Sequence, residues 1–388
     1  MRLLRRNLGK MDYLKEFETN LAYHFSEVLE YLFARPYWVY VSLSHKCTYN
    51  CQMCGVVKIL KGYELPRETL EKALDEIAGW DWDCSVILTG GEPFLRADIF
   101  ELIDYAVRRG IPVESVSNGS LIDKELAHKI ISSGLENIAI SLDGAKEATH
   151  DSIRQKGSFS QAMNAIRNLV LAKEELGRGP QISVWTTIMK ENVTELYDII
   201  PLARGLGIDC LVYHPVVVAQ DDMQNTSPDA PFWIRQDNLK LLKGQIDKIC
   251  DYQDKNGLVA FLHDPYLWVK HFEGALTRQD WKCNPFVFIN IGPDGEVRSC
   301  GSSFGNIGKR SLDDCLHTKE AHKARCLMKK CQKPCLQTCW AHPVSDSPIF
   351  IADALIKRLK EDKVGTEKKR EIIEKAIAAL ERYEDIAK

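Results

Sequence analysis

The sequence predicts an α/β fold: a partial, TIM-like (β/α)6 barrel, followed by a small cysteine-rich β-hairpin/α domain and C-terminal helices. Short apolar segments alternate with amphipathic segments between residues 38 and 213, which favours a parallel sheet covered by helices. Cysteines gather from residue 283 onward, and residues 348–388 show a charged helical pattern. A doubly wound sheet would show the same alternation, so the alternation alone does not decide between the two layouts.

Six segments rich in apolar, β-branched and aromatic residues are the expected strands, and each but the last precedes a helical segment. A (β/α) barrel places its chemistry at the carboxyl ends of the strands, so functional residues are expected in the loops that follow them. The expected strands are Trp38–Ser44, Ser85–Leu88, Val113–Val116, Ile138–Leu142, Ile182–Ile188 and Cys210–Tyr213. The expected helices are Pro66–Trp80, Ile99–Arg109, Asp123–Ser133, Phe159–Leu176 and Val193–Leu206.

Changes in composition divide the chain into five expected parts. They are an N-terminal helical extension (1–36), the barrel (37–218), a connector with one helix (219–282), the cysteine-rich domain (283–345) and the C-terminal helices (346–388).

The charge and the cysteine count narrow the class of protein. A net charge of −3 is close to neutral and argues against a nucleic-acid partner. The N-terminal run is too polar for a signal peptide and no window approaches a transmembrane segment, so we expect a cytoplasmic protein. In that compartment thiols stay reduced, so the clustered ones among the 13 cysteines indicate metal ligands or catalytic groups rather than disulfides.

Cys47, Cys51 and Cys54 form a C-x3-C-x2-C motif directly after the first expected strand. A structural zinc site requires four ligands, whereas a [4Fe–4S] cluster is commonly held by cysteine thiolates. Three thiolates would leave one iron open to the amino and carboxylate groups of a methionine moiety. The alternative is a zinc site completed by His45, which is disfavoured because zinc motifs usually come as paired C-x2-C units.

Two further motifs follow the second and third expected strands. Gly90 and Gly91 would let the backbone approach a ligand closely, and Glu92 offers a carboxylate to a cationic amine. Asn118 follows the third strand. Each motif alone also fits an ordinary turn, but their positions on successive strand ends favour a ligand site.

These motifs together resemble the radical SAM superfamily, whose members use a [4Fe–4S] cluster to cleave S-adenosylmethionine (SAM). The resemblance implies that the three cysteines hold the SAM-binding cluster, that Glu92 holds the amino group of SAM, and that Asn118 contacts the ribose. It also implies that Ser141 and Arg154, after the fourth strand, bind the SAM carboxylate, for which the planar guanidinium is suited. Met53 stands where the family often has an aromatic residue near the adenine, although plain loop packing is equally open.

The second cysteine group resembles the SPASM or twitch extension of radical SAM enzymes, which holds auxiliary [4Fe–4S] clusters. Cys283, an expected hairpin over Phe286–Ile291 and Glu296–Ser299, and Cys300 give the spacing C-x11-G-x4-C. The family's C-x2-C-x5-C run is absent, so we favour one auxiliary cluster, while two stay open. A zinc ribbon is the alternative. The candidate ligands are Cys283, Cys300, Cys331, Cys335 and Cys339.

The resemblance implies a radical enzyme that abstracts hydrogen from a substrate carbon and receives electrons from a reductase such as flavodoxin or ferredoxin. Residues 1–36 are too few for the winged-helix peptide-recognition domain of many peptide maturases, which favours a small-molecule, cofactor or lipid-precursor substrate. Modification of a ribosomal peptide or a protein side chain is the alternative. A non-catalytic iron–sulfur electron carrier is more remote, because a carrier has no need of Glu92 or Arg154.

Overall fold

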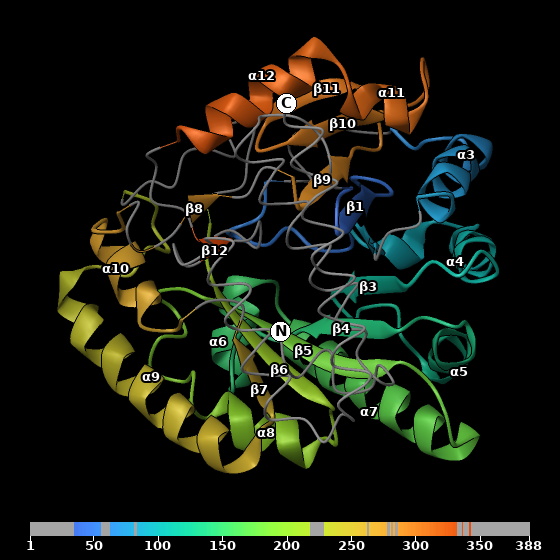
Figure 1. Cartoon of the computed structure of the whole chain (residues 1–388). Coiled ribbons are helices and arrows are strands. Elements are labelled where there is room, and N and C mark those ends of the chain that lie inside the picture. Colours follow the sequence, from blue (N-terminus) through green and yellow to red (C-terminus); the bar gives the residue numbers. More distant parts are fainter. Residues whose placement is uncertain are drawn as a thin grey trace, which may run out of the picture.

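The computed structural model describes residues 35–55, 63–80, 84–217, 229–261, 264–277, 280, 282–283, 286–331, 336 and 341–342. Within them, one sheet runs through the molecule in the strand order β11-β10-β9-β1-β2-β3-β4-β5-β6-β7 (Figure 1). The strands from β1 to β7 pair in parallel and in chain order. They are β1 (Trp38–Ser42), β2 (Ser85–Thr89), β3 (Val113–Ser117), β4 (Asn137–Ser141), β5 (Gln181–Ile188), β6 (Cys210–Pro215) and β7 (Val259–Phe261).

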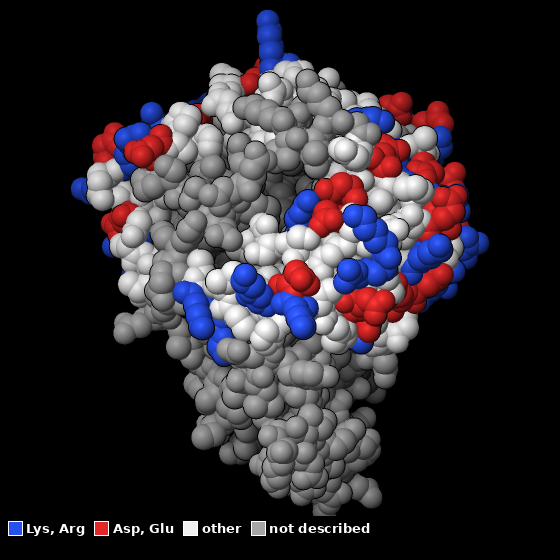
Figure 2. Space-filling view, turned by 90° about the horizontal axis from the view of Figure 1, so that it is seen from above, with Lys and Arg blue, Asp and Glu red and all other residues white. Residues whose placement is uncertain are grey.

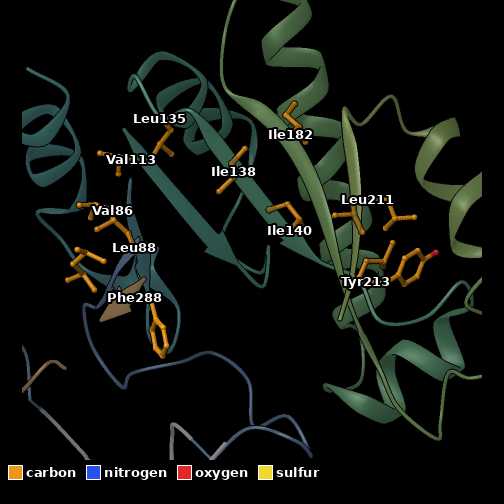
Figure 3. Packing of buried hydrophobic residues seen from close by; sticks show 14 of the residues in the cluster. Val86, Leu88, Val113, Leu135, Ile138, Ile140, Ile182, Leu211, Tyr213 and Phe288 are labelled. Atoms are coloured by element: carbon orange, nitrogen blue, oxygen red, sulfur yellow. The ribbon is translucent and has the colours of Figure 1, made fainter. Parts of the chain in front are cut away.

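Helices lie along the outside of this curved parallel sheet (Figure 1). They are amphipathic, and their apolar faces pack on buried strand residues such as Val113, Ile138, Ile140 and Leu211 (Figure 3). The helices are α3 (Arg67–Ala78), α4 (Ile99–Val107), α5 (Lys124–Ser132), α6 (Glu147–Ile153), α7 (Ser158–Leu176), α8 (Ile199–Gly205), α9 (Gln236–Asn256) and α10 (Leu267–Glu273).

The two faces of β1 and of β3 differ in exposure. In β1 and β3, buried residues alternate with half-buried ones, as expected when successive side chains point to opposite faces. The buried set packs against the helices, and the half-buried set, which includes Tyr40 and Glu114, lines the inside of the curve. This partial exposure of the inner face, together with the parallel strand order, is typical of an open (β/α) barrel.

The hairpin that follows residue 283 extends the barrel sheet. Strand β9 (Phe288–Ile291) pairs in parallel with β1, with Trp38 opposite Phe288, and β10 (Glu296–Ser299) and β11 (Ser302–Asn306) add antiparallel strands outside it. Helices α11 (Leu312–Leu316) and α12 (Lys319–Lys329) follow, and two short strands, β8 (Lys282–Cys283) and β12 (Ala341–His342), pair with each other.

The α/β fold class predicted from the sequence is confirmed, whereas the predicted C-terminal helices (346–388) and most of the predicted N-terminal extension (1–36) lie outside the described residues. All six expected strands are present, and the expected hairpin is observed as β9 and β10. Several elements were missed, among them α6 and β7. Helix α6 is seven residues long and its sequence shows no apolar repeat, and β7 is a three-residue strand inside the segment taken as a connector. None of the described helices is long and apolar enough to cross a bilayer. Lysines, arginines, aspartates and glutamates intermingle on the face shown in Figure 2, in keeping with a net charge of −3.

A carboxylate on α3 fastens α11 to the barrel. Glu76 accepts hydrogen bonds from the backbone amides of Leu312 (2.9 Å) and Asp313 (2.8 Å), at the beginning of α11. We expect Glu76→Ala to lower the free energy of unfolding by about 1 to 2 kcal/mol, the usual value of a helix N-cap. Urea denaturation measures this. The exposed Glu68 of the same helix is the control, and equal losses in both variants would contradict the prediction.

Candidate functional site

The three cysteines of the first motif lie in the loop after β1. Cys51 is buried, and Cys47 and Cys54 are half-buried. Burial raises the pKa of Cys51 to about 11 and is opposed by the positive charge of Arg154. In the described part of the chain, no three cysteine, histidine or carboxylate side chains stand close enough to hold a metal ion together. The loop therefore brings the thiols to one strand end without gathering them into a closed site.

The glycines after β2 let that strand's end press against the cysteine loop. The amide of Gly91 donates to the carbonyl of Ser44 (2.8 Å), and the amide of Glu92 donates to the carbonyl of Lys46 (2.8 Å). A Cβ atom on Gly91 would lie 2.0 Å from the Lys46 carbonyl oxygen, and one on Gly90, whose φ is +125°, would lie 2.4 Å from that of Ser44. Only glycine fits both positions.

Glu92 is a buried carboxyl, only 1% exposed, that crosses to the end of β3. One oxygen accepts from the Ser117 hydroxyl (2.9 Å) and from the Phe94 amide (3.3 Å), and the other accepts from the Asn118 amide (2.9 Å). Burial raises the pKa of Glu92 to about 6, against these three hydrogen bonds and the charge of Arg154. The hydrogen bonds therefore hold the carboxyl in place, while burial makes its ionised form less favourable.

Asn118 connects the end of β3 back to the cysteine loop. Its side-chain amide lies 3.0 Å from the Thr48 hydroxyl, to which it donates, and 3.5 Å from the Cys47 sulfur. Its carbonyl oxygen accepts from the Ser120 amide (2.8 Å). Asn118 thus contacts a thiol that the sequence analysis assigns to the first cluster.

Arg154, at the end of α6, is held by Asp143 from the loop after β4. Its Nε donates to Asp143 Oδ2 (2.6 Å), and the two side chains are 10% and 0% exposed. No described residue accepts a hydrogen bond from the two terminal guanidinium nitrogens. The backbone also ties this segment to the cysteine loop, because the amide of Gln52 donates to the carbonyl of Ile153 (3.0 Å). Arg154 therefore stands beside the loop with most of its donor fork available.

The remaining predicted SAM-site residues occupy plainer positions. Ser141 ends β4 and is half-buried, opposite Trp185 of β5. Met53 packs partly against the core. Sequence reasoning gave no role to Ser117 and Asp143, which hold Glu92 and Arg154 in place. Both directly adjoin predicted motifs, which was the available signal.

The second cysteine group is only partly described. The structure describes the backbone of Cys283, in β8, but not its side chain. Cys335 and Cys339 lie outside the described residues. Cys300 is half-buried and is the described non-glycine residue with positive φ (+47°), in the turn between β10 and β11. Cys331 is half-buried just after α12. A non-glycine residue in this backbone region is uncommon and marks a position where the turn geometry is imposed.

Comparison with known proteins identifies this arrangement. A family model described as the radical SAM superfamily matches residues 41–215. An "AdoMet-dependent heme synthase" of Methanosarcina barkeri is 31% identical over 175 residues, which are 44% of this chain and 48% of that protein. A "Mycofactocin maturase MftC" of Mycolicibacterium smegmatis is 33% identical over 171 residues, 43% of this chain and 42% of that protein. The matches to both proteins span about half of their length or less.

Some matches extend beyond the barrel. A "Fe-coproporphyrin III synthase" of Methanosarcina barkeri is 30% identical over 294 residues, which are 72% of this chain and 67% of that protein. Among solved structures, Streptococcus suis SuiB bound to its precursor peptide SuiA is similar with a TM-score of 0.60 and 14% identity, over 78% of this chain and 72% of SuiB. That likeness shows the fold.

The close contact at Gly91 predicts that a larger residue there will weaken both folding and iron binding. Gly91→Ala should lower the free energy of unfolding by about 1 to 3 kcal/mol and remove most of the iron that the chain binds on anaerobic reconstitution, because the new methyl group separates the two loops. Gly205→Ala in α8 is the control, since a Cβ there meets nothing within 4 Å. Iron assays and urea denaturation measure both effects. Normal iron binding by Gly91→Ala would contradict the prediction.

The buried His150 predicts that the stability of the protein depends on pH. Burial, assisted by Arg154, lowers the pKa of His150 to about 4, and its Nδ1 accepts from the Asp143 amide (3.0 Å). As the pH falls from about 6.5 to about 4, the unfolded chain takes up a proton that the folded chain refuses. The wild type should therefore lose about 3 kcal/mol of unfolding free energy relative to His150→Asn across that window.

The measurement is urea denaturation of the cluster-free protein at pH 7 and pH 4. His128→Asn is the matched control, because hydrogen bonds to the carbonyl of Lys124 and to Glu175 raise the pKa of the exposed His128. A wild-type minus His150→Asn difference that does not change with pH would refute the neutral state of His150.

Proposed function

This chain belongs to the radical SAM superfamily, and we propose that it cleaves SAM reductively at a [4Fe–4S] cluster held by Cys47, Cys51 and Cys54. The observation that carries the proposal is the way one cysteine loop is bonded to three later segments. It meets Glu92 through backbone hydrogen bonds, Asn118 through its side-chain amide, and the Arg154 segment through Gln52.

The chain's own groups suit the amino acid end of SAM. Glu92 offers a buried carboxylate to the amino group, and Arg154 offers the free part of its guanidinium to the carboxylate. Asp143 holds Nε and so aims the rest of the fork. Because Glu92 and Arg154 carry opposite charges, they complement a zwitterion, with Gly90, Gly91 and Ser141 beside it.

The rest of SAM would lie along neighbouring strand ends, with Asn118 next to the ribose and Met53 near the adenine. The donor set fits the proposed cluster, since three thiols lie on one loop and the Asn118 amide already donates toward the Cys47 sulfur. When bound, the cluster would supply the electron that breaks a carbon–sulfur bond of SAM to give methionine and a 5′-deoxyadenosyl radical. The protein's part is to position, shield and orient.

We further propose one auxiliary [4Fe–4S] cluster with ligands drawn from Cys283, Cys300, Cys331, Cys335 and Cys339. The strained turn at Cys300 supports it, because such a backbone persists only where its surroundings impose it. Flavodoxin or ferredoxin is the proposed electron donor, and the cytoplasm, where thiols stay reduced, is the proposed location.

For the substrate, we favour a small molecule of the cofactor type. The match that extends through 294 residues is to an enzyme named for Fe-coproporphyrin III, a small molecule. The alternative is a peptide, supported by the similarity to a mycofactocin maturase. Anaerobic incubation with deuterated candidates of both kinds separates them, because only the true substrate transfers deuterium into 5′-deoxyadenosine.

The test of SAM cleavage uses two charge-removing variants. We expect the reconstituted wild type to bind about eight irons per chain, four for each [4Fe–4S] cluster, and to form 5′-deoxyadenosine with dithionite. Glu92→Gln and Arg154→Gln should each lose SAM binding by about tenfold or more, which is the loss of a charge-assisted hydrogen bond. Calorimetry or equilibrium dialysis measures the affinity.

Matched controls are Glu101→Gln and Arg167→Gln, two exposed residues on α4 and α7. They should bind SAM as the wild type does. A wild-type protein that binds zinc in place of iron and leaves SAM intact would overturn the proposal.

A further inference from the structure

Arg154 depends on a helix that its own sequence leaves without a cap. Helix α6 has seven residues, too few to be stable alone. Its N-cap position is Lys146, which makes no side-chain capping bond and places a positive charge at the positive end of the helix dipole. Some other group must therefore stabilise the helix that positions Arg154.

Glu195, in the loop after β5, instead anchors the two residues that precede α6 and one side chain in its first turn. One carboxylate oxygen accepts from the backbone amides of Ala145 (3.1 Å) and Lys146 (3.2 Å), and the other accepts from the Thr149 hydroxyl (2.7 Å). The Lys146 ammonium lies 3.4 Å from the same carboxylate. Glu195 is only 5% exposed, so its charge is directed to this helix end rather than to water.

The same turn also fixes the loop before α6. Asn192 donates its side-chain amide to the carbonyls of Asp143 (2.7 Å) and Thr187 (2.8 Å). The Thr187 amide in turn donates to Asp143 Oδ1 (2.8 Å). Asp143 holds Arg154, so one turn after β5 restrains both ends of the segment that carries the guanidinium.

We infer that Glu195 is a positioning residue for SAM: it sets SAM affinity through α6 and Arg154 without touching SAM itself. The inference rests on the proposed role of Arg154 in binding the SAM carboxylate. Without Glu195, α6 loses its N-terminal acceptor and the guanidinium fork samples orientations that do not match the carboxylate. Affinity for SAM falls, whereas the cysteine loop keeps its own bonds to Glu92 and Asn118.

The test measures the Kd of SAM for the reconstituted full-length enzyme by equilibrium dialysis, with Glu195→Ala, Glu195→Gln and Arg154→Lys beside the wild type. Glu195→Ala should weaken SAM binding by about fivefold or more, because it removes hydrogen bonds to a charged acceptor. Iron content should not change. Glu195→Gln keeps one oxygen acceptor, so its Kd for SAM should lie between those of the wild type and Glu195→Ala. Glu147→Gln is the control, an exposed carboxylate in the first turn of the same helix.

Kinetics provide the readout that a merely structural role would not produce. With dithionite and no other substrate, Glu195→Ala should raise the KM for SAM and leave kcat for 5′-deoxyadenosine at saturating SAM unchanged. A loss of iron or of kcat in this variant would make Glu195 a structural residue and overturn the inference. Wild-type SAM affinity in Glu195→Ala, with weakened binding in Arg154→Lys, would overturn the inference alone. Wild-type affinity in both variants would instead overturn the proposed role of Arg154.

Discussion

The close backbone contact between the loops after β1 and β2 is the constraint on which the site depends. It continues the strand pairing past Ser42, since the amide of Leu43 donates to the carbonyl of Thr89 (2.9 Å) and the bonds of Gly91 and Glu92 follow. No side chain larger than hydrogen fits between the two loops at Gly91. The contact fixes the position of the loop that carries Cys47 relative to the buried carboxyl of Glu92.

The charges of the site are arranged before any ligand arrives. Glu92 is raised in pKa by burial, and Arg154 is buried against Asp143 beside thiols that would become thiolates on metal binding. Holding such groups away from water is unfavourable, and hydrogen bonds from neighbouring strand ends maintain the arrangement. The rigidity comes from loops that hold one another, because Asp143 and Asn192 join the end of β4 to that of β5.

The sequence predicted the barrel because each strand carries a run of apolar residues. Glu92, Asn118 and Arg154 were singled out because the motifs that contain them resemble those of the radical SAM superfamily. The sequence did not predict that Asp143 would hold Arg154 or that Glu195 would anchor the start of α6. Their roles depend on contacts across 11 and 46 residues, to Arg154 and Thr149, and a single sequence shows no pattern at such separations. Helix α6 was missed for the same reason, since its stability comes from a distant residue.

The pairing of β9 with β1 has a consequence for how the chain is made. Strand β1 lies between β2 and β9 in the sheet, and β9 begins only at Phe288. During synthesis, β1 and β2 can pair early, but the outer edge of β1 stays open until residues 288–291 have left the ribosome. An open edge is a template for wrong pairing, so we expect the nascent barrel to be prone to aggregation until β9 has paired with β1. Strand β9, the first strand of the hairpin that follows Cys283, therefore closes this edge in the nascent protein.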